Sequence, residues 1–168
     1  FAELEEAFGR DVRSLVEEIG IPVEQLDAYL DDCTRLARRL FETEGWALTV
    51  PVGVRFIRPS RALLAVQQPV VRDADGTARP VGLWAMVNLA LTIGTPRGAE
   101  MLRLFHDAAL AYGGRSHPGK FHFDSPEQMR RCYDLERFLP IRAVADPDGC
   151  FLNGWNRDLF RLPEPTSA

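Results

Sequence analysis

The amino-acid sequence predicts an α+β fold in which helices flank an antiparallel sheet. Hydrophobic residues recur every three or four positions before Gly45, alternate with polar residues just after it, and return to helical spacing after Pro96. This order of helices, then strands, then helices favours an α+β layer over a doubly wound sheet. At 168 residues, the chain can bury a sizeable core as one domain or as one part of a larger protein.

Residues 1–45 are predicted to form a hairpin of two helices that leads into the rest of the fold. The first helix would bury one apolar stripe: Leu4, Phe8, Val12, Leu15, Val16 and Ile19. Its charged residues would face solvent on the other side, and Gly20-Ile21-Pro22 would separate it from the second helix. The second apolar stripe contains Leu26, Leu30, Cys33, Ala37, Leu40 and Phe41.

Residues 46–168 are predicted to form one unit with a sheet, further helices and a C-terminal tail. Strands are expected at 48–57, 62–66 and 83–93, with a turn at 73–76. Pro51 indicates an edge position or a bulge in the first strand, and Asn88 lies at the centre of the last. Helices are expected from Pro96 to Gly113, at 126–133 and at 135–145, with a loop at 115–123 and a turn at 146–149.

The composition argues against several classes of protein. The net charge is -4 and no long basic run is present, which argues against nucleic acid as a partner. The longest apolar stretch, 81–93, is too short to span a membrane, and it contains Asn88. Three widely spaced cysteines, and an acidic amphipathic start with no visible signal peptide, predict a reducing, cytoplasmic location.

Lys120 is the single lysine in a chain that otherwise uses arginine for every basic position. It is therefore a candidate for a site that needs a compact ammonium group. Segment 114–120 matches the first seven positions of a phosphate-binding P-loop. However, the segment follows a helix, Pro118 removes one N–H donor, and Phe121 lacks the hydroxyl that would hold magnesium. A nucleoside triphosphatase is therefore not expected.

The histidines do not predict a metal site. His106, His117 and His122, even taken with Cys132, have no zinc-finger spacing. His106 lies on a predicted helix, and the two loop histidines are explained by ordinary hydrogen bonds.

Three segments resemble a known enzyme family. Gly113-Gly114-Arg115-Ser116-His117-Pro118-Gly119-Lys120 resembles the Gly-Gly-Arg-Pro-His-Trp-Gly-Lys motif of the sugar-1,4-lactone oxidase and alditol oxidase family, which are FAD enzymes of the vanillyl-alcohol oxidase type. Val52-Gly53-Val54-Arg55 resembles the family's Glu-x-Arg strand. The stretch from Asp146 to Asn153 resembles its closing Asp-Pro-x-Gly-x-Phe-x-Asn pattern.

The resemblance implies that the chain is the C-terminal cap domain of such an enzyme, which supplies the substrate side of the site. FAD would be bound mainly by an N-terminal domain of the same protein, because this chain has neither a glycine-rich dinucleotide motif nor a flavin-attachment segment. The substrate would be a small polyol or a sugar lactone. The chain alone is then expected to be colourless and inactive.

The resemblance also implies roles for individual residues. Lys120 matches the family's lysine, whose ammonium would stabilise negative charge on the reduced flavin. Arg55 matches the arginine that holds the substrate hydroxyl, with a surface ion pair as the alternative interpretation. Arg115, within the glycine-lysine motif, is expected to bind substrate.

Two departures from the family pattern leave the substrate open. Gly53 stands where the family has glutamate, and the spacing to Lys120 places Asn88 where alditol oxidases have a histidine proposed as the base. Because an amide cannot usefully accept a proton, His117 is the candidate catalytic base and Asn88 a candidate substrate-binding residue. Asn88 and Arg55 are expected on the same side of the sheet.

A second function remains open from the sequence. The chain could be a stand-alone α+β binding or interaction domain without catalytic activity, its flavin-site residues having drifted. The reading frame upstream of Phe1 distinguishes the two, since a contiguous flavin domain there supports the enzyme.

Overall fold

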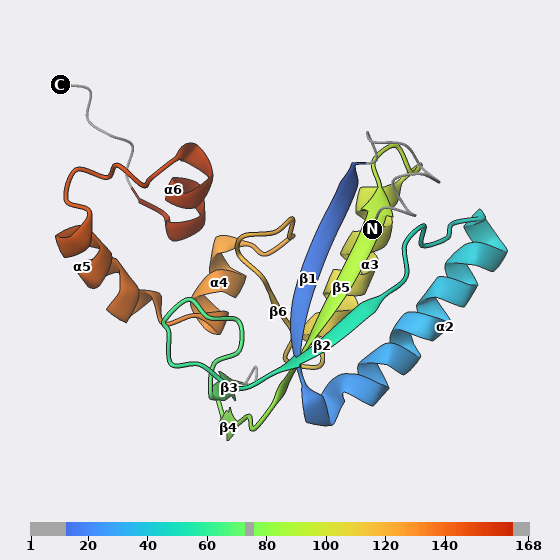
Figure 1. Ribbon diagram of the computed structural model, residues 1–168, viewed down its shortest axis with the longest axis horizontal. Coiled ribbons are helices and arrows are strands. Elements are labelled where there is room, and N and C mark those ends of the chain that lie inside the picture. The colour runs from blue at the N-terminus through green and yellow to red at the C-terminus, as the bar shows by residue number, and fades with distance from the viewer. Residues whose placement is uncertain (1–12, 73–75, 163–168) are drawn as a thin grey trace, which may run out of the picture.

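The computed structural model describes residues 13–72 and 76–162 and has the predicted α+β fold (Figure 1). Its main sheet has the strand order β2-β5-β1-β6, and each neighbouring pair is antiparallel. The strands of this sheet are β1 (Ser14–Pro22), β2 (Gly53–Ile57), β5 (Trp84–Thr92) and β6 (Arg115–Ser116). A separate antiparallel pair consists of β3 (Val70–Arg72) and β4 (Ala78–Pro80).

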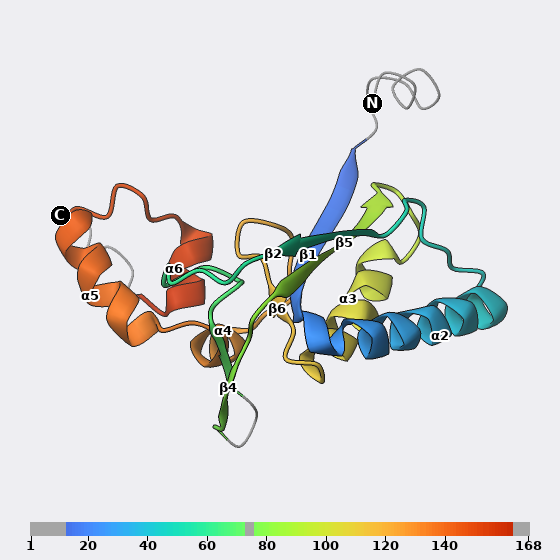
Figure 2. The same cartoon turned by 60° about the horizontal axis from the view of Figure 1, so that its bottom comes forward.

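Helices lie on one face of the main sheet and beyond its β6 edge (Figures 1 and 2). They are α2 (Leu26–Glu44), α3 (Gly98–Leu110), α4 (Pro126–Cys132), α5 (Leu135–Ala145) and α6 (Gly154–Phe160), with a short 3₁₀ helix, η1 (Val23–Gln25), before α2. Helices α2 and α3 cover the same face of the sheet, which we call the core face. The C-terminal helices have a smaller apolar cluster of their own, which includes Met129, Leu135 and Phe160.

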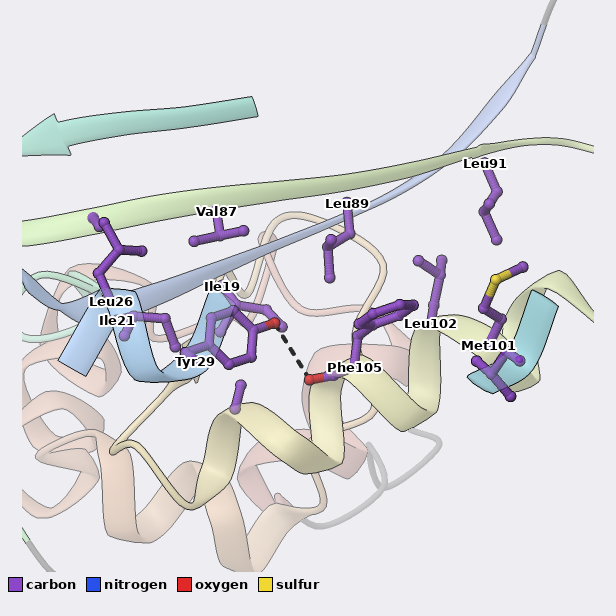
Figure 3. Packing of buried hydrophobic residues seen from close by; sticks show 13 residues of the cluster. Ile19, Ile21, Leu26, Tyr29, Val87, Leu89, Leu91, Met101, Leu102 and Phe105 are labelled. Carbon is purple, nitrogen blue, oxygen red and sulfur yellow. Dashed lines mark hydrogen bonds between the residues drawn. The ribbon is translucent and has the colours of Figure 1, made fainter. Parts of the chain in front are cut away.

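The core face buries an apolar layer between the sheet and helices α2 and α3 (Figure 3). Side chains of β5 and α3 face one another across this layer: Val87, Leu89, Leu91, Met101, Leu102 and Phe105. Tyr29 of α2 is fully buried, and its hydroxyl donates a 3.4 Å hydrogen bond to the carbonyl of Phe105. Apolar burial of this kind is the main favourable contribution to folding.

The prediction of a first helix is wrong for the part of it that the structure describes, because 14–22 forms strand β1. The rest of that predicted helix lies in 1–12, outside the described residues. The apolar spacing in this segment fits a helix or a strand, and its β-branched residues favour a strand. Glu17 and Glu18, expected on a solvated face, are both buried. Strand β1 therefore lies within the sheet, where its pairing with β5 joins the N-terminal segment to the rest of the fold.

The strand predicted at 62–66 is also wrong. This segment forms local turns, in which the N–H of Ala65 donates to the carbonyl of Ala62 at 3.0 Å. β2 is shorter than its predicted strand and lies at an edge of the sheet, as Pro51 indicates. The predicted turn at 73–76 falls mostly outside the described residues. Strands β3, β4 and β6 and helix α6 were not among the expected elements, and β6 lies in the loop expected at 115–123. At two or three residues, the three strands are too short to show a periodic pattern.

The remaining predicted elements are confirmed. Helices α2, α3, α4 and α5 and strand β5 occupy the expected segments. Helix α4 begins at a capping box in which Ser125 and Gln128 each accept the other's backbone N–H. After α5, the carboxylate of Asp146 accepts the N–H of Cys150 at 2.7 Å and that of Phe151 at 3.3 Å, which closes the expected turn.

Replacement of Gly20 tests how closely the 62–66 segment packs on the sheet. A Cβ atom added at Gly20 would lie 2.5 Å from Cγ1 of Val66 and 3.2 Å from Sδ of Met86. We expect Gly20→Ala to lower the free energy of unfolding by about 1–3 kcal/mol, because the buried Val66 must move. Urea denaturation measures the change, with Gly82→Ala as the control because no atom lies within 4 Å of its added Cβ. Equal stabilities of the two variants would contradict this packing.

Candidate functional site

The face of the sheet opposite α2 and α3 carries the predicted site residues Arg55 and Asn88, and we call it the polar face. Asn88 on β5 pairs with Gly53 on β2 and with Glu18 on β1. Arg55 lies opposite Met86, two residues from Asn88. Directly opposed residues, and residues two apart in a strand, point to the same side of a sheet. Arg55 and Asn88 therefore share the polar face, as predicted, and Glu18 lies with them.

Glu18 is a buried carboxylate that holds Arg55 in place. Its side chain is only 5% exposed, and its Oε1 lies 2.8 Å from Nη2 of Arg55, which is 64% exposed. The ion pair crosses strand β5 on the polar face, above the half-buried Asn88. The guanidinium is thus fixed through one nitrogen while most of its surface stays open to a ligand. The sequence does not point to Glu18 as a site residue, because neighbouring charges on an expected helix indicate a solvent-exposed face.

The loop that contains Lys120 is attached to the same stretch of β1. The N–H of His117 donates to the carbonyl of Glu18 at 2.8 Å, and the N–H of Phe121 donates to the carbonyl of Val16 at 3.2 Å. The intervening residues turn out from the edge of the sheet and leave Lys120 exposed. In the part of the chain that the structure describes, the Lys120 ammonium has no ion-pair partner within 4.0 Å. The structure therefore attaches the Lys120 loop to the middle of β1, next to Glu18 of the Glu18–Arg55 pair.

His117 orders the loop from within. Its Nδ1 accepts the N–H of Gly119 at 3.0 Å, and its carbonyl accepts the N–H of Lys120 at 3.0 Å. The backbone N–H groups of Gly119 and Lys120 are therefore already engaged within the loop. A neutral His117 that accepts at Nδ1 carries its proton on Nε2, so its basic nitrogen is occupied. This geometry suits a residue that positions the loop, and a role for His117 as base stays a prediction.

Arg115 lies apart from the other site residues. The register places it in the same row as Arg55, since Arg115 pairs with Gly20 and Gly20 pairs with Met86. Its side chain is turned toward β3, where Nη2 donates to the carbonyl of Val70 at 2.9 Å. Its guanidinium carbon lies 5.3 Å from the ring centre of Trp84. The structure therefore does not group Arg115 with the Glu18–Arg55 pair.

A buried cluster of two carboxylates and a histidine lies on the core face, on the side of β1 opposite to Glu18. Oε1 of Glu17 lies 2.8 Å from Nδ1 of His106 on α3, and Oδ1 of Asp124 lies 3.5 Å from Nε2 of the same ring. The hydroxyl of Ser116 is 3.2 Å from Nδ1. All these side chains are almost fully buried. The cluster connects β1, α3 and β6 with the chain that follows the Lys120 loop.

Burial and charge pull the pKa values of this cluster in opposite directions. Burial lowers the pKa of His106, but the hydrogen bond and charge of Glu17, with the charges of Asp124 and Asp107, outweigh burial and raise it. Burial raises the pKa of Glu17, and the hydrogen bond from His106 only partly offsets this effect. The cluster therefore keeps its protons to a higher pH in the folded chain than in the unfolded one.

The described residues contain neither a cluster that could hold a metal ion nor a helix that could cross a membrane. Among residues 13–72 and 76–162, no three His, Cys, Asp or Glu side chains gather in a way that could hold a metal ion. Within the same ranges, no helix combines the length and the apolar character that crossing a bilayer requires.

The chain matches the model of a known protein family. A sequence profile described as D-arabinono-1,4-lactone oxidase matches residues 7–159. The chain belongs to the D-arabinono-1,4-lactone oxidase family. No curated protein sequence gives a significant match to it. The matched region includes every residue of the Glu18–Arg55 pair and of the Lys120 loop.

The carboxylate beside Arg55 comes from a different strand than the Glu-x-Arg resemblance implies. The resemblance to the Glu-x-Arg strand lacks its carboxylate, because Gly53 stands at that position. The register places Gly53, Asn88 and Glu18 in one row across three neighbouring strands. The polar face therefore does carry a carboxylate beside Arg55, supplied by β1 and not by β2.

The Glu17–His106 cluster predicts a pH dependence of stability. A group whose pKa is raised by folding stabilises the fold below its unfolded pKa, which is 6.5 for histidine, and this contribution is lost as pH rises through the folded value. We therefore expect the melting temperature of the native chain to fall as the pH is raised from about 6.5 upward. His106→Gln should flatten this dependence, as measured by thermal denaturation across the range.

His122→Gln is the matched control for this experiment. Burial lowers the pKa of His122, so its effect on stability has the opposite sign and appears as pH falls below 6.5. The His122 variant should therefore keep the decline on the alkaline side. A native chain whose melting temperature does not change over this range would contradict the assignment.

Proposed function

We propose that this chain is the substrate-binding C-terminal domain of an FAD-dependent oxidoreductase that oxidises a CH–OH group of a sugar lactone, an alditol or a similar alcohol. The observation that supports it most directly is the exposed guanidinium of Arg55, fixed by buried Glu18 next to Asn88 on an otherwise open part of the sheet. The family match supports a lactone oxidase-related domain. In this proposal the partner is an N-terminal flavin domain of the same cytoplasmic protein.

The polar face offers complementary hydrogen-bonding groups to a polyhydroxylated substrate. Arg55 can donate through its free N–H groups, and the amide of Asn88 can both donate and accept. A hydroxyl bound by both groups would be held in one position on the polar face. The pair of charges disfavours an apolar substrate.

The residues present fit the FAD that the family generally uses. Lys120 is exposed, and no carboxylate in the described residues competes for its ammonium. Bound FAD would accept the CH–OH hydrogen as a hydride, that is two electrons and one proton, and the hydroxyl proton would leave to the candidate base His117 or to solvent. Lys120 would then stabilise negative charge developing beside it, as a fixed ammonium does in water-excluded sites. Glu18 would keep Arg55 on the substrate oxygen throughout.

Replacement of Lys120 tests the flavin role. In the flavin-containing protein, we expect Lys120→Met to lower the rate of flavin reduction by about ten- to a thousand-fold, equivalent to about 1.4–4 kcal/mol of lost charge stabilisation. Lys120→Arg should also be slow, because a planar fork does not replace a compact ammonium. Stopped-flow spectroscopy at saturating substrate measures the rate.

The control is Arg38→Met, which removes an exposed positive charge from α2 on the other side of the sheet. It should leave the rate unchanged. Because Lys120 is exposed, the Lys120 variants should also have the same melting temperature as the native protein. Native rates in both Lys120 variants would show that the single lysine has no part in the reaction.

Replacement of Glu18 tests the support of Arg55. We expect Glu18→Gln to raise KM for the alcohol substrate roughly tenfold or more, because an amide holds the guanidinium less firmly than a charged carboxylate. Steady-state kinetics with the same substrate measure the effect. Glu44→Gln is the control, since Glu44 forms an exposed and longer ion pair with Arg97, at 3.9 Å. Unchanged KM in the Glu18 variant would separate this carboxylate from substrate binding.

A further inference from the structure

A cavity of about 690 Å³ lies between the β3–β4 pair and the start of α5, apart from the Glu18–Arg55 pair. Arginines from three elements line it: Arg72 of β3, Arg115 of β6, and Arg130 and Arg131 of α4. A neighbouring cavity of about 570 Å³ shares Arg72, Arg115 and Arg131 with it. The chain is acidic overall, so this local concentration of positive charge requires a physical explanation.

Arg115 is the residue that indicates a ligand-binding site in this cavity. It is only 3% exposed, yet no carboxylate in the described residues pairs with it. One nitrogen, Nη2, donates to the carbonyl of Val70, while Nη1 is buried without a hydrogen-bond partner in the described part of the chain. Burying an unpaired guanidinium costs several kcal/mol on the usual scale, so such groups are normally paired.

The acidic residues at the cavity do not neutralise it. Asp134 caps helix α5, where its Oδ1 accepts the N–H of Arg137 at 3.1 Å and its Oδ2 lies 4.0 Å from the Arg137 side chain. Glu136 is exposed on the first turn of the same helix. Among the described residues that line the cavity, four guanidinium groups therefore accompany two carboxylates, one of which is already engaged. The start of α5 adds the partial positive charge of a helix N-terminus.

The elements around the cavity are held together independently of any ligand. The hydroxyl of Tyr133 donates to the carbonyl of Ser116 at 2.8 Å, which fixes the end of α4 against β6. The ring of Trp84 supports the guanidinium of Arg115 from the sheet. Arg115 is thus positioned before a ligand arrives, and little ordering would oppose binding.

We propose that this cavity binds a phosphate group, either as free phosphate or as part of a phosphate ester. A tetrahedral dianion can accept hydrogen bonds from several guanidinium groups that approach from different elements, and arginine is well suited to this geometry. The anion supplies the countercharge that Arg115 lacks. The site is separate from the polar-face pair, so its existence does not depend on the proposed oxidoreductase function.

Isothermal titration calorimetry of the 168-residue chain with inorganic phosphate, at constant ionic strength, tests the proposal. We expect saturable binding with one phosphate per chain. Arg115→Met should weaken it at least tenfold, and the paired exposed substitutions Arg130→Gln and Arg131→Gln should weaken it at least threefold. Arg38→Gln, on α2, should leave it unchanged. If Arg115→Met does not fold, the double variant at Arg130 and Arg131 tests the phosphate site in its place.

Two further titrations identify the source of the anion. Glycerol phosphate should bind at least as tightly as inorganic phosphate if the ligand is an ester, and more weakly if it is free phosphate; both results support the site. Succinate should bind at least tenfold more weakly than phosphate, because its carboxylates are planar and well separated. Absence of saturable phosphate binding, equal losses in the Arg38 variant, or equal affinity for succinate would overturn the proposal.

Discussion

Two adjacent glutamates on strand β1 point to opposite faces of the sheet, and the arrangement of the other elements depends on their partners. Glu17 contacts His106 of α3 on the core face, and Glu18 contacts Arg55 of β2 on the polar face. A carboxylate buried without a partner costs several kcal/mol, so each contact is a condition for β1 to lie inside the sheet. Helix α3 and edge strand β2 are thereby fixed relative to the same two residues.

The pairing of β1 with β5 converts this constraint into the geometry of the site. A slip of one residue would exchange the faces of Glu17 and Glu18 and place each carboxylate opposite the wrong partner. In the observed register, Glu18 lies opposite Asn88, and the Lys120 loop is hydrogen-bonded to the β1 backbone on either side of Glu17. One strand therefore sets the positions of the basic side chain, the amide and the loop.

The parts of the structure that the sequence predicts are those whose signal is local. Strand β5 is a long apolar run, and helices α2 and α3 have long periodic patterns. Arg55, Asn88 and Lys120 stand out by resemblance to family motifs. The polar face shared by Arg55 and Asn88 follows from alternation along β5. β1 and Glu18 are different, because two neighbouring charges resemble a solvated helix face until tertiary partners are known. Short elements such as β3 depend on tertiary contacts in the same way.

The two arginines of one row of the sheet show how the same residue type acquires different chemistry. Arg55 and Arg115 lie at opposite edges of that row, with Met86 and Gly20 between them. Because Gly20 has no side chain, Val66 can pack directly on the sheet at this point and fill the space between the two arginines. Arg55 is left exposed with a carboxylate, and Arg115 is enclosed without one. A glycine and a valine thus lie between the exposed Arg55 and the buried Arg115 on one face of one sheet.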